Sequence, residues 1–257
     1  MFVLLEAIAV WLIVSNNSQQ GAVFFNSANQ VSGRILNTQS SVIYYFSLAA
    51  VNKALVDKNA ELLSELEQYR QPVDSMYIPL DSTMRNAFQF KGAKVINNSI
   101  NLAQNFITIN KGARHGIKEG MGVFNEEGVV GRVKGVTQNF ASVISLLHTE
   151  LLVSSKIESS EVFGSTKWDG KDPKRAKLLY VPRHVDLKVG DKVVTSGYNQ
   201  IFPEGIPIGR IVEISPGTET NYLDVSIELA TDFTRVSYVY LVENSAEVEL
   251  EALDNLN

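Results

Sequence analysis

The N-terminal part of the chain begins with an apolar run and continues into polar residues. Phe2 to Val14 is apolar apart from Glu6, and Ser15 starts a stretch rich in Ser, Asn and Gln. Thirteen residues are too few to cross a bilayer, because a membrane helix needs about 20. We therefore expect residues 1–14 to be the end of a transmembrane anchor whose first turns precede this start. A buried helix of a soluble domain is the alternative.

A heptad pattern follows and predicts one long helix over residues 29–69. Within the predicted helical region, 15–72, leucines and asparagines alternate at the two positions that close a two-stranded coiled coil. This predicted dimerisation seam comprises Leu48, Asn52, Leu55, Asn59, Leu62 and Leu66. Asn in such a seam lowers stability but fixes register and favours dimers. An amphipathic helix packed on its own domain is the alternative, and Pro72 ends the helix in either case.

From Gly92 onward, short runs of alternating apolar and polar residues predict a mainly β region. The predicted strands are 93–100, 105–110, 122–124, 129–138, 142–147, 153–157, 162–167, 176–181, 192–195, 207–215, 222–228 and 238–242. Their spacing predicts two small antiparallel β-barrel-like modules after the helix. The first covers residues 73–150 and the second 151–243, with the open alternative that 231–243 returns to the first module. Residues 244–257 form an acidic tail that we expect to be flexible.

Three blocks of the β region recur in the same order. Residues 117–123 match 187–193, residues 128–133 match 205–211, and residues 142–147 match 224–229. A recurring set of blocks indicates a duplicated supersecondary unit. The sequence therefore predicts two copies of one β module.

Composition excludes several classes of function. The 257 residues carry a formal net charge of −5 without a basic block, which disfavours nucleic-acid binding. Cysteine is absent, so disulfides and cysteine-based metal sites are excluded. The three histidines lie far apart in the sequence and show no metal-ligand spacing. We expect no cofactor and no metal.

The sequence offers little support for catalysis. Gly164 to Lys171 faintly resembles a phosphate-binding loop, but the glycine spacing is wrong and Asp172 replaces the Ser or Thr that holds magnesium. Neither a G-x-S-x-G turn nor an S-x-x-K pair is present. We therefore predict no catalytic residues.

Binding features are easier to find. The predicted strands 153–157 and 238–242 are candidate free edges that would accept a partner strand. Near the second module's central turn, Tyr198 and Phe202 either fill the barrel interior or stand exposed as anchors for a partner. The sequence leaves these two alternatives open.

Several turn motifs carry a resemblance to a known family. Residues 108–112, 116–121 and 128–133 form the first group, and residues 190–197 and 201–209 form the second. With these motifs the chain resembles the rod shape-determining protein MreC family. The turn residues on which the resemblance rests are Gly112, Gly120, Gly131, Thr195, Ser196, Gly197, Phe202, Pro203, Gly205 and Gly209.

The resemblance implies a non-catalytic scaffold for lateral peptidoglycan synthesis and rod-shape maintenance. It implies a single-pass protein of the bacterial inner membrane, with a dimerising coiled coil and periplasmic β-barrels. The implied partners are a class B penicillin-binding protein, MreD and MreB, besides a second copy of the chain or a higher assembly. Two other functions stay open on the residues alone. One is a periplasmic adaptor of an efflux or secretion system, and the other is a polysaccharide hydrolase.

Overall fold

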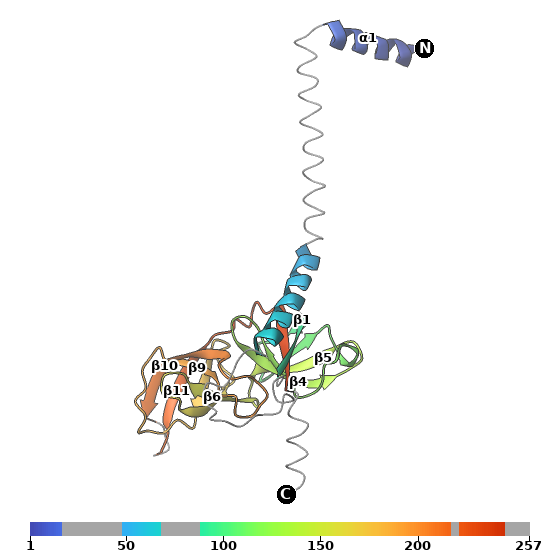
Figure 1. The fold of residues 1–257 in the computed structure, drawn as a ribbon. Helices are drawn as coiled ribbons and strands as arrows, with labels where there is room; N and C mark the ends of the chain where they lie inside the picture. Colours follow the sequence, from blue (N-terminus) through green and yellow to red (C-terminus); the bar gives the residue numbers. More distant parts are fainter. Residues whose placement is uncertain (17–47, 68–87, 217–220, 245–257) are drawn as a thin grey trace. The chain divides into compact units, whose positions relative to one another are not determined.

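The computed structural model describes residues 1–16, 48–67, 88–216 and 221–244 (Figure 1). The chain divides into two compact units, Met1–Ala54 and Leu55–Asn257. Helix α1 (Phe2–Asn16) lies in the first unit, and a second helix covers residues 48–67. In the described part of the chain, no helix combines the length and apolar character that crossing a bilayer requires. About half of the predicted long helix lies outside the described residues, so the coiled coil stays a prediction.

The β region forms two closed six-stranded barrels, which confirms the predicted mainly β fold (Figure 1). The first barrel has the strand order β1-β12-β3-β4-β5-β2. Its strands are β1 (Phe88–Asn98), β2 (Gln104–Ile109), β3 (Gly122–Phe124), β4 (Val129–Val136), β5 (Ala141–His148) and β12 (Tyr238–Asn244). A short 3-10 helix, η2 (Ala113–His115), connects β2 to β3.

The second barrel has the order β10-β11-β8-β7-β6-β9. Its strands are β6 (Leu152–Ile157), β7 (Phe163–Lys167), β8 (Arg175–Leu179), β9 (Lys192–Thr195), β10 (Pro207–Pro216) and β11 (Leu223–Leu229). The segment that faintly resembled a phosphate-binding loop therefore begins within strand β7, because residues 164–167 pair with neighbouring strands.

The two barrels share one topology, as the recurring sequence blocks predict. Strands β3, β4 and β5 hold the places in the first barrel that β9, β10 and β11 hold in the second. Continuing round each barrel, β12 occupies the place of β6. The first barrel thus takes its sixth strand from a point in the chain beyond the second barrel. Because the second barrel is inserted between β5 and β12, two chain crossings join the barrels.

A pair of equivalent glycines shows why the duplicated strands share residues. Gly131 lies on β4 and Gly209 lies on β10, the corresponding strand of the second barrel. A Cβ atom on Gly131 would overlap the carbonyl oxygen of Ile144, and one on Gly209 would overlap that of Glu228. In both barrels the strand passes too close to its neighbour for a side chain.

The expected free strand edges are wrong. Strand β6 pairs with both β7 and β9, and β12 pairs with both β1 and β3. Closure of each barrel satisfies both backbone edges of these strands. Neither strand can therefore accept a partner strand without opening its barrel.

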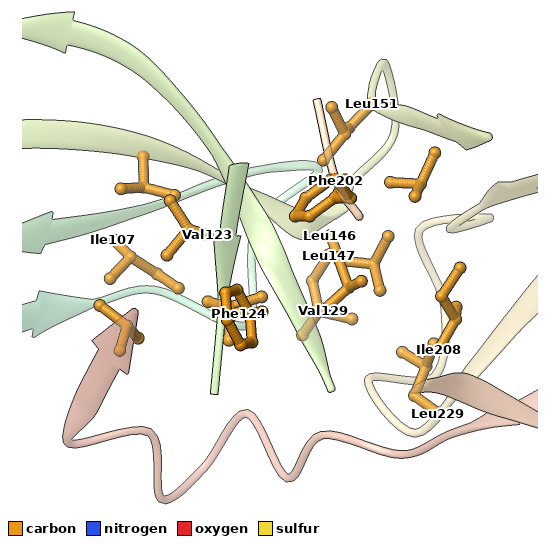
Figure 2. Close-up of a cluster of buried hydrophobic side chains, with 14 of the residues drawn as sticks. Ile107, Val123, Phe124, Val129, Leu146, Leu147, Leu151, Phe202, Ile208 and Leu229 are labelled. Atoms are coloured by element: carbon orange, nitrogen blue, oxygen red, sulfur yellow. The ribbon is translucent and has the colours of Figure 1, made fainter. Parts of the chain in front are cut away.

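The buried apolar side chains of both barrels form a single cluster (Figure 2). Leu146 and Leu147 from β5 belong to this cluster together with Phe202, which follows β9. Leu151 lies in the segment that connects β5 of the first barrel to β6 of the second, and it is also buried. The core is therefore continuous from one barrel to the other.

Candidate functional site

The joint loop, residues 196–206, connects β9 to β10 and contains the most specific family motif. Its ends are fixed by one side chain, because Thr195 Oγ1 donates to the Pro203 carbonyl at 2.6 Å and accepts from the Ile206 amide at 2.9 Å. Gly197 and Gly205 have φ angles of 73° and 93°, which favour glycine. Ser196 contacts Ser154 of β6 through their hydroxyls at 2.7 Å. The loop is thus held to its own barrel.

Phe202 leaves the joint loop and packs against the first barrel. Its side chain is 3 % exposed, whereas Tyr198 in the same loop is 82 % exposed. A Cβ atom on Gly122 of β3 would lie 2.6 Å from the Phe202 ring and 2.8 Å from the Ile201 carbonyl oxygen. The absence of a side chain at Gly122 therefore makes room for the aromatic ring. Of the two alternatives for these aromatics, burial holds for Phe202 and exposure for Tyr198.

A buried lysine holds the outer end of the joint loop. Lys156 on β6 is 6 % exposed, and its ammonium group donates to the carboxylates of Glu161 and Glu204. These hydrogen bonds raise the pKa of Lys156 against the opposing effect of desolvation. Lys156 therefore ties Glu204 of the joint loop to the second barrel.

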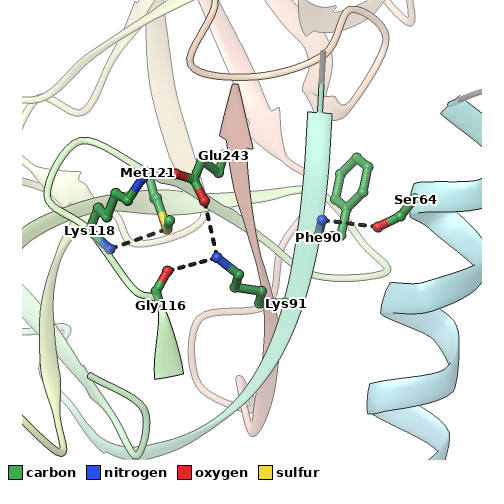
Figure 3. A network of polar contacts seen from close by, with 7 residues as sticks. All are labelled: Ser64, Phe90, Lys91, Gly116, Lys118, Met121 and Glu243. Atoms are coloured by element: carbon green, nitrogen blue, oxygen red, sulfur yellow. Dashed lines mark hydrogen bonds and ion pairs between the residues drawn. The ribbon is translucent and has the colours of Figure 1, made fainter. Parts of the chain in front are cut away.

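The helix of residues 48–67 contacts the first barrel along one face from Val56 onward. Ser64 Oγ accepts a hydrogen bond from the Phe90 amide at 3.1 Å (Figure 3). Asn59 donates to the Tyr240 hydroxyl at 3.2 Å, and Lys111 pairs with Asp57 at 3.2 Å. These contacts fix the end of the helix to strands β1 and β12 and to the loop after β2.

The helix surface that the barrel leaves uncovered exposes leucines of the predicted seam. The exposed fractions are 40 % for Leu48, 55 % for Leu55, 48 % for Leu62 and 63 % for Leu66. Asn52 is partly buried, and Asn59 bonds the barrel as described above. The leucine row is thus open on the described helix, and its pairing with a second copy stays a prediction.

Gly92 lets the helix approach strand β1. A Cβ atom there would overlap Val56 Cγ1 and lie 3.1 Å from the Val56 carbonyl oxygen. We expect Gly92→Ala to destabilise the docked helix by about 1–3 kcal/mol, because the helix must shift to relieve the clash. Faster hydrogen exchange of the amides of residues 55–67, with the barrel amides unchanged, would show this. Gly135→Ala is the control, since the nearest atom to its Cβ is 4.0 Å away. Equal exchange in the two variants would contradict the prediction.

A polar network closes the first barrel beside β12 (Figure 3). Lys91 Nζ donates to the Gly116 carbonyl at 2.7 Å and to Glu243 at 3.0 Å, and Lys118 also pairs with Glu243. Burial would raise the pKa of Glu243, but the hydrogen bonds from the two lysines lower it below its usual value. The network therefore links β12, the last strand, to β1, the first strand of the β region.

The joint loop, the helix and the first barrel surround a groove of about 870 Å³. The helix contributes Leu62, Leu63 and Leu66, and the barrel contributes Phe90, Phe124 and Tyr240. The joint loop and the start of β10 contribute Pro203, Ile206 and Pro207. Most of its lining is apolar, so the groove is a candidate surface for binding another protein segment.

The remaining motif glycines are placed in turns of the first barrel. Gly112 precedes η2, and a side chain there would lie 2.6 Å from the Phe140 amide nitrogen. Gly120 has a φ angle of 89° in the turn before β3. These glycines shape the barrel and lie outside the residues that line the groove.

Sequence reasoning missed the residues that hold distant segments together. Three such residues contact a segment at least 48 positions away in the sequence: Lys156, Glu243 and Gly122. A lysine at an inward position of the predicted strand 153–157 is the one available signal, because a buried lysine needs carboxylate partners. Among the described residues, no cluster of His, Asp or Glu has the arrangement of a metal site.

His148 ends β5 at the crossing between the barrels and is 2 % exposed. Desolvation lowers the pKa of His148, with the charge of Lys134 acting in the same direction and Glu150 opposing it. Its Nδ1 accepts a hydrogen bond from the Glu150 amide at 3.1 Å. The folded state therefore favours the neutral imidazole.

Acidification should weaken the protein through His148. The unfolded chain binds a proton at His148 near pH 6.5, whereas the folded chain does so only at lower pH, so stability falls as pH drops below about 6.5. We expect His148→Gln to flatten the dependence of the free energy of unfolding on pH between about 6.5 and 5. Urea unfolding at a series of pH values measures this. An unchanged slope in His148→Gln would refute the prediction.

The fold and its contacts define a class of protein. The two barrels have the same topology, and the second is inserted into the sequence of the first. The buried ring of Phe202 joins them, and the helix of residues 48–67 is docked on the first barrel. The family model described as "Rod shape-determining protein MreC, barrel core" matches residues 95–243, which is more than half of the chain. The chain belongs to the MreC family of rod shape-determining proteins.

Individual comparisons agree with this membership. The cell shape-determining protein MreC of Escherichia coli is 27 % identical over 193 residues, covering 75 % of this chain and 52 % of that protein. A solved MreC structure from Listeria monocytogenes is 26 % identical with a TM-score of 0.58, covering 79 % of this chain and 93 % of that one. A structure described as the major periplasmic domain from the cell shape-determining filament MreC is 28 % identical, with a TM-score of 0.54 and coverage of 62 % and 98 %.

This chain spans about half the length of the curated E. coli relative. The family match covers the strands of both barrels from within β1 to within β12. The adaptor and hydrolase alternatives find no support in these comparisons.

Proposed function

We propose that this chain is a non-catalytic envelope scaffold for lateral peptidoglycan synthesis and rod-shape maintenance. Membership in the MreC family, matched across both barrels, is the observation that carries the proposal. The E. coli relative is named a cell shape-determining protein, which supports the same role here. The similarity to a periplasmic MreC domain supports placing the barrels in the periplasm.

The proposed arrangement is a single-pass inner-membrane protein that dimerises through its helix. The exposed leucines Leu48 and Leu55, which lie outside the groove, support the coiled-coil seam, because apolar side chains left in water favour association. Pairing two chains raises the effective concentration of a second contact, so individually weak contacts can hold a partner. A filament is the alternative form of self-assembly.

The proposed partners are a class B penicillin-binding protein, MreD and MreB. The buried contact of Phe202 with the first barrel supports this role, because a scaffold must present its binding surfaces in a fixed geometry. The exposed aromatic side chains Phe163 and Tyr198, with ring centroids 6.2 Å apart, offer one such surface on the second barrel. Exposed aromatics beside a fixed loop are typical anchors in protein interfaces.

Site-specific photocrosslinking in a rod-shaped bacterium that depends on this chain tests the proposal. A photoreactive residue is placed at Tyr198, and the captured proteins are identified after irradiation of living cells. Capture of a penicillin-binding protein, together with restoration of rod shape, is the expected result. The same residue placed at Lys171, on an exposed turn, is the control. Recovery of an outer-membrane channel alone, or normal rods without the chain, would refute the proposal.

A further inference from the structure

The groove at the base of the helix has three walls from separate parts of the chain. The helix, the first barrel and the joint loop each contribute side chains to it. Within the described part of the chain, the lining consists of Asn59, Leu62, Leu63, Leu66, Glu67, Phe90, Phe124, Asn125, Glu126, Pro203, Glu204, Gly205, Ile206, Pro207 and Tyr240. A groove built at such a meeting point exists only in the folded head.

Each wall of the groove is held by contacts of its own lining residues. Phe124 stacks edge-to-face on Phe90 at 5.8 Å and lies 5.6 Å from the Tyr240 ring. Asn59 fixes the helix wall to Tyr240, and Thr195 fixes the joint-loop wall at Pro203. The groove is therefore formed before any partner arrives, which lowers the entropic cost of binding.

The chemistry of the lining is apolar with acidic positions. Among the described residues, the lining includes the carboxylates of Glu67, Glu126 and Glu204 and no Lys, Arg or His. The exposed carboxylate of Glu126 is the position available to a cationic partner. Lys156 compensates Glu204 from the side of the second barrel. The groove thus matches a partner that combines apolar side chains with positive charge.

The helix wall indicates the form of this partner. Leu62 and Leu66 stand one helical turn apart, are about half or more exposed, and form a ridge beside the aromatic floor. Such a ridge packs against the side chains of another helix. We propose that the groove binds an amphipathic helix of a partner protein, whose apolar face is flanked by Lys or Arg.

Two other possible occupants of the groove, a second copy of this chain and the chain's own residues 68–87, match its acidic lining less well. The exposed side of the helix in a second copy carries Glu61 and Glu65 as well as Lys58, so it brings mixed charge. The chain's own residues 68–87 contain two Arg and two Asp and include Pro72 and Pro79, which disfavour a helix. The proposal rests on the scaffold function above and adds the chemical class of one partner surface.

Fluorescence anisotropy with the full chain tests the proposal. The probe is a labelled synthetic helix of about 16 residues, with leucines at the spacing of one helical face and lysines beside them. A twin probe carries glutamate in place of lysine. We expect the wild-type chain to bind the lysine probe at least about tenfold more tightly than the glutamate probe, with the difference shrinking at high salt.

Variants separate the charge from the apolar contacts. Glu126→Lys should remove most of the preference for the lysine probe, and Leu66→Asn should weaken both probes about tenfold. Glu213→Lys and Leu152→Asn are the matched controls, because Glu213 and Leu152 are exposed and lie outside the groove and the predicted seam. The controls should bind both probes as the wild type does.

Several results would overturn the proposal. Equal binding of the two probes, no binding of either, or equal losses in groove and control variants would each do so. Loss of self-association in Glu126→Lys, without binding of the probe to the wild type, would assign the groove to a second copy. Probe binding only after residues 74–82 are replaced by Gly and Ser would assign it to the chain's own segment. A wild-type chain that restores rod shape but binds no probe refutes this proposal and leaves the scaffold function intact.

Discussion

Replacing Phe202 by alanine should lower the free energy of unfolding by about 3–5 kcal/mol, as large-to-small changes of buried aromatics do. The ring is 3 % exposed and lies against Gly122 of the other barrel, so its removal leaves a cavity in the shared core. The two chain crossings remain in the variant, and they limit how far the barrels can close the gap. Equilibrium unfolding in urea measures the loss.

Replacing Phe202 should also affect the contact between the two barrels. We expect faster hydrogen exchange in β3 and in the joint loop of the variant, because these segments contact the missing ring. Tyr198→Ala is the control from the same loop and should stay within about 0.5 kcal/mol of the wild type, since Tyr198 is largely exposed. A Phe202 variant as stable as the Tyr198 variant would show that the barrels do not depend on this ring.

The sequence predicted the strands and the duplication because both depend on local patterns. Alternation of apolar and polar residues marks each strand, and the recurring glycines mark the equivalent turns. Gly131 and Gly209 recur because the same close approach of two strands occurs in both barrels. Local patterns could not decide whether residues 231–243 belong to the first or the second barrel. The pairing of β12 depends on contacts across about 150 positions with β1 and about 120 positions with β3.

The candidate site was harder to predict because it consists of contacts between distant segments. The motif residues around Phe202 were found, but Gly122, which receives its ring, lies 80 positions earlier. The sequence predicted barrel-like modules. It did not reveal that closure of the barrels pairs both edges of β6 and of β12. The groove depends on the docked helix, and that docking is revealed by contacts such as those of Ser64 and Val56 with β1.

Replacing Leu48 and Leu55 together by lysine should abolish the proposed dimer at micromolar concentration. Both side chains are about half exposed in the single chain, so pairing would bury the remaining apolar surface. A symmetric dimer contains each substitution twice, so four leucine side chains are lost. Together these four side chains contribute about 3–6 kcal/mol to association. The dissociation constant should therefore rise at least about a hundredfold.

Sedimentation velocity of the full chain in detergent, over a range of concentrations, measures this change. Neither leucine lines the groove, so the variant should bind the lysine probe normally. Leu152→Lys is the matched control, because Leu152 is 47 % exposed on the second barrel and lies outside the helix. An unchanged dimer in the double variant would remove the coiled-coil seam, and self-association would then have to come from the barrels. Equal dissociation in the Leu152 control would point to the same barrel surface.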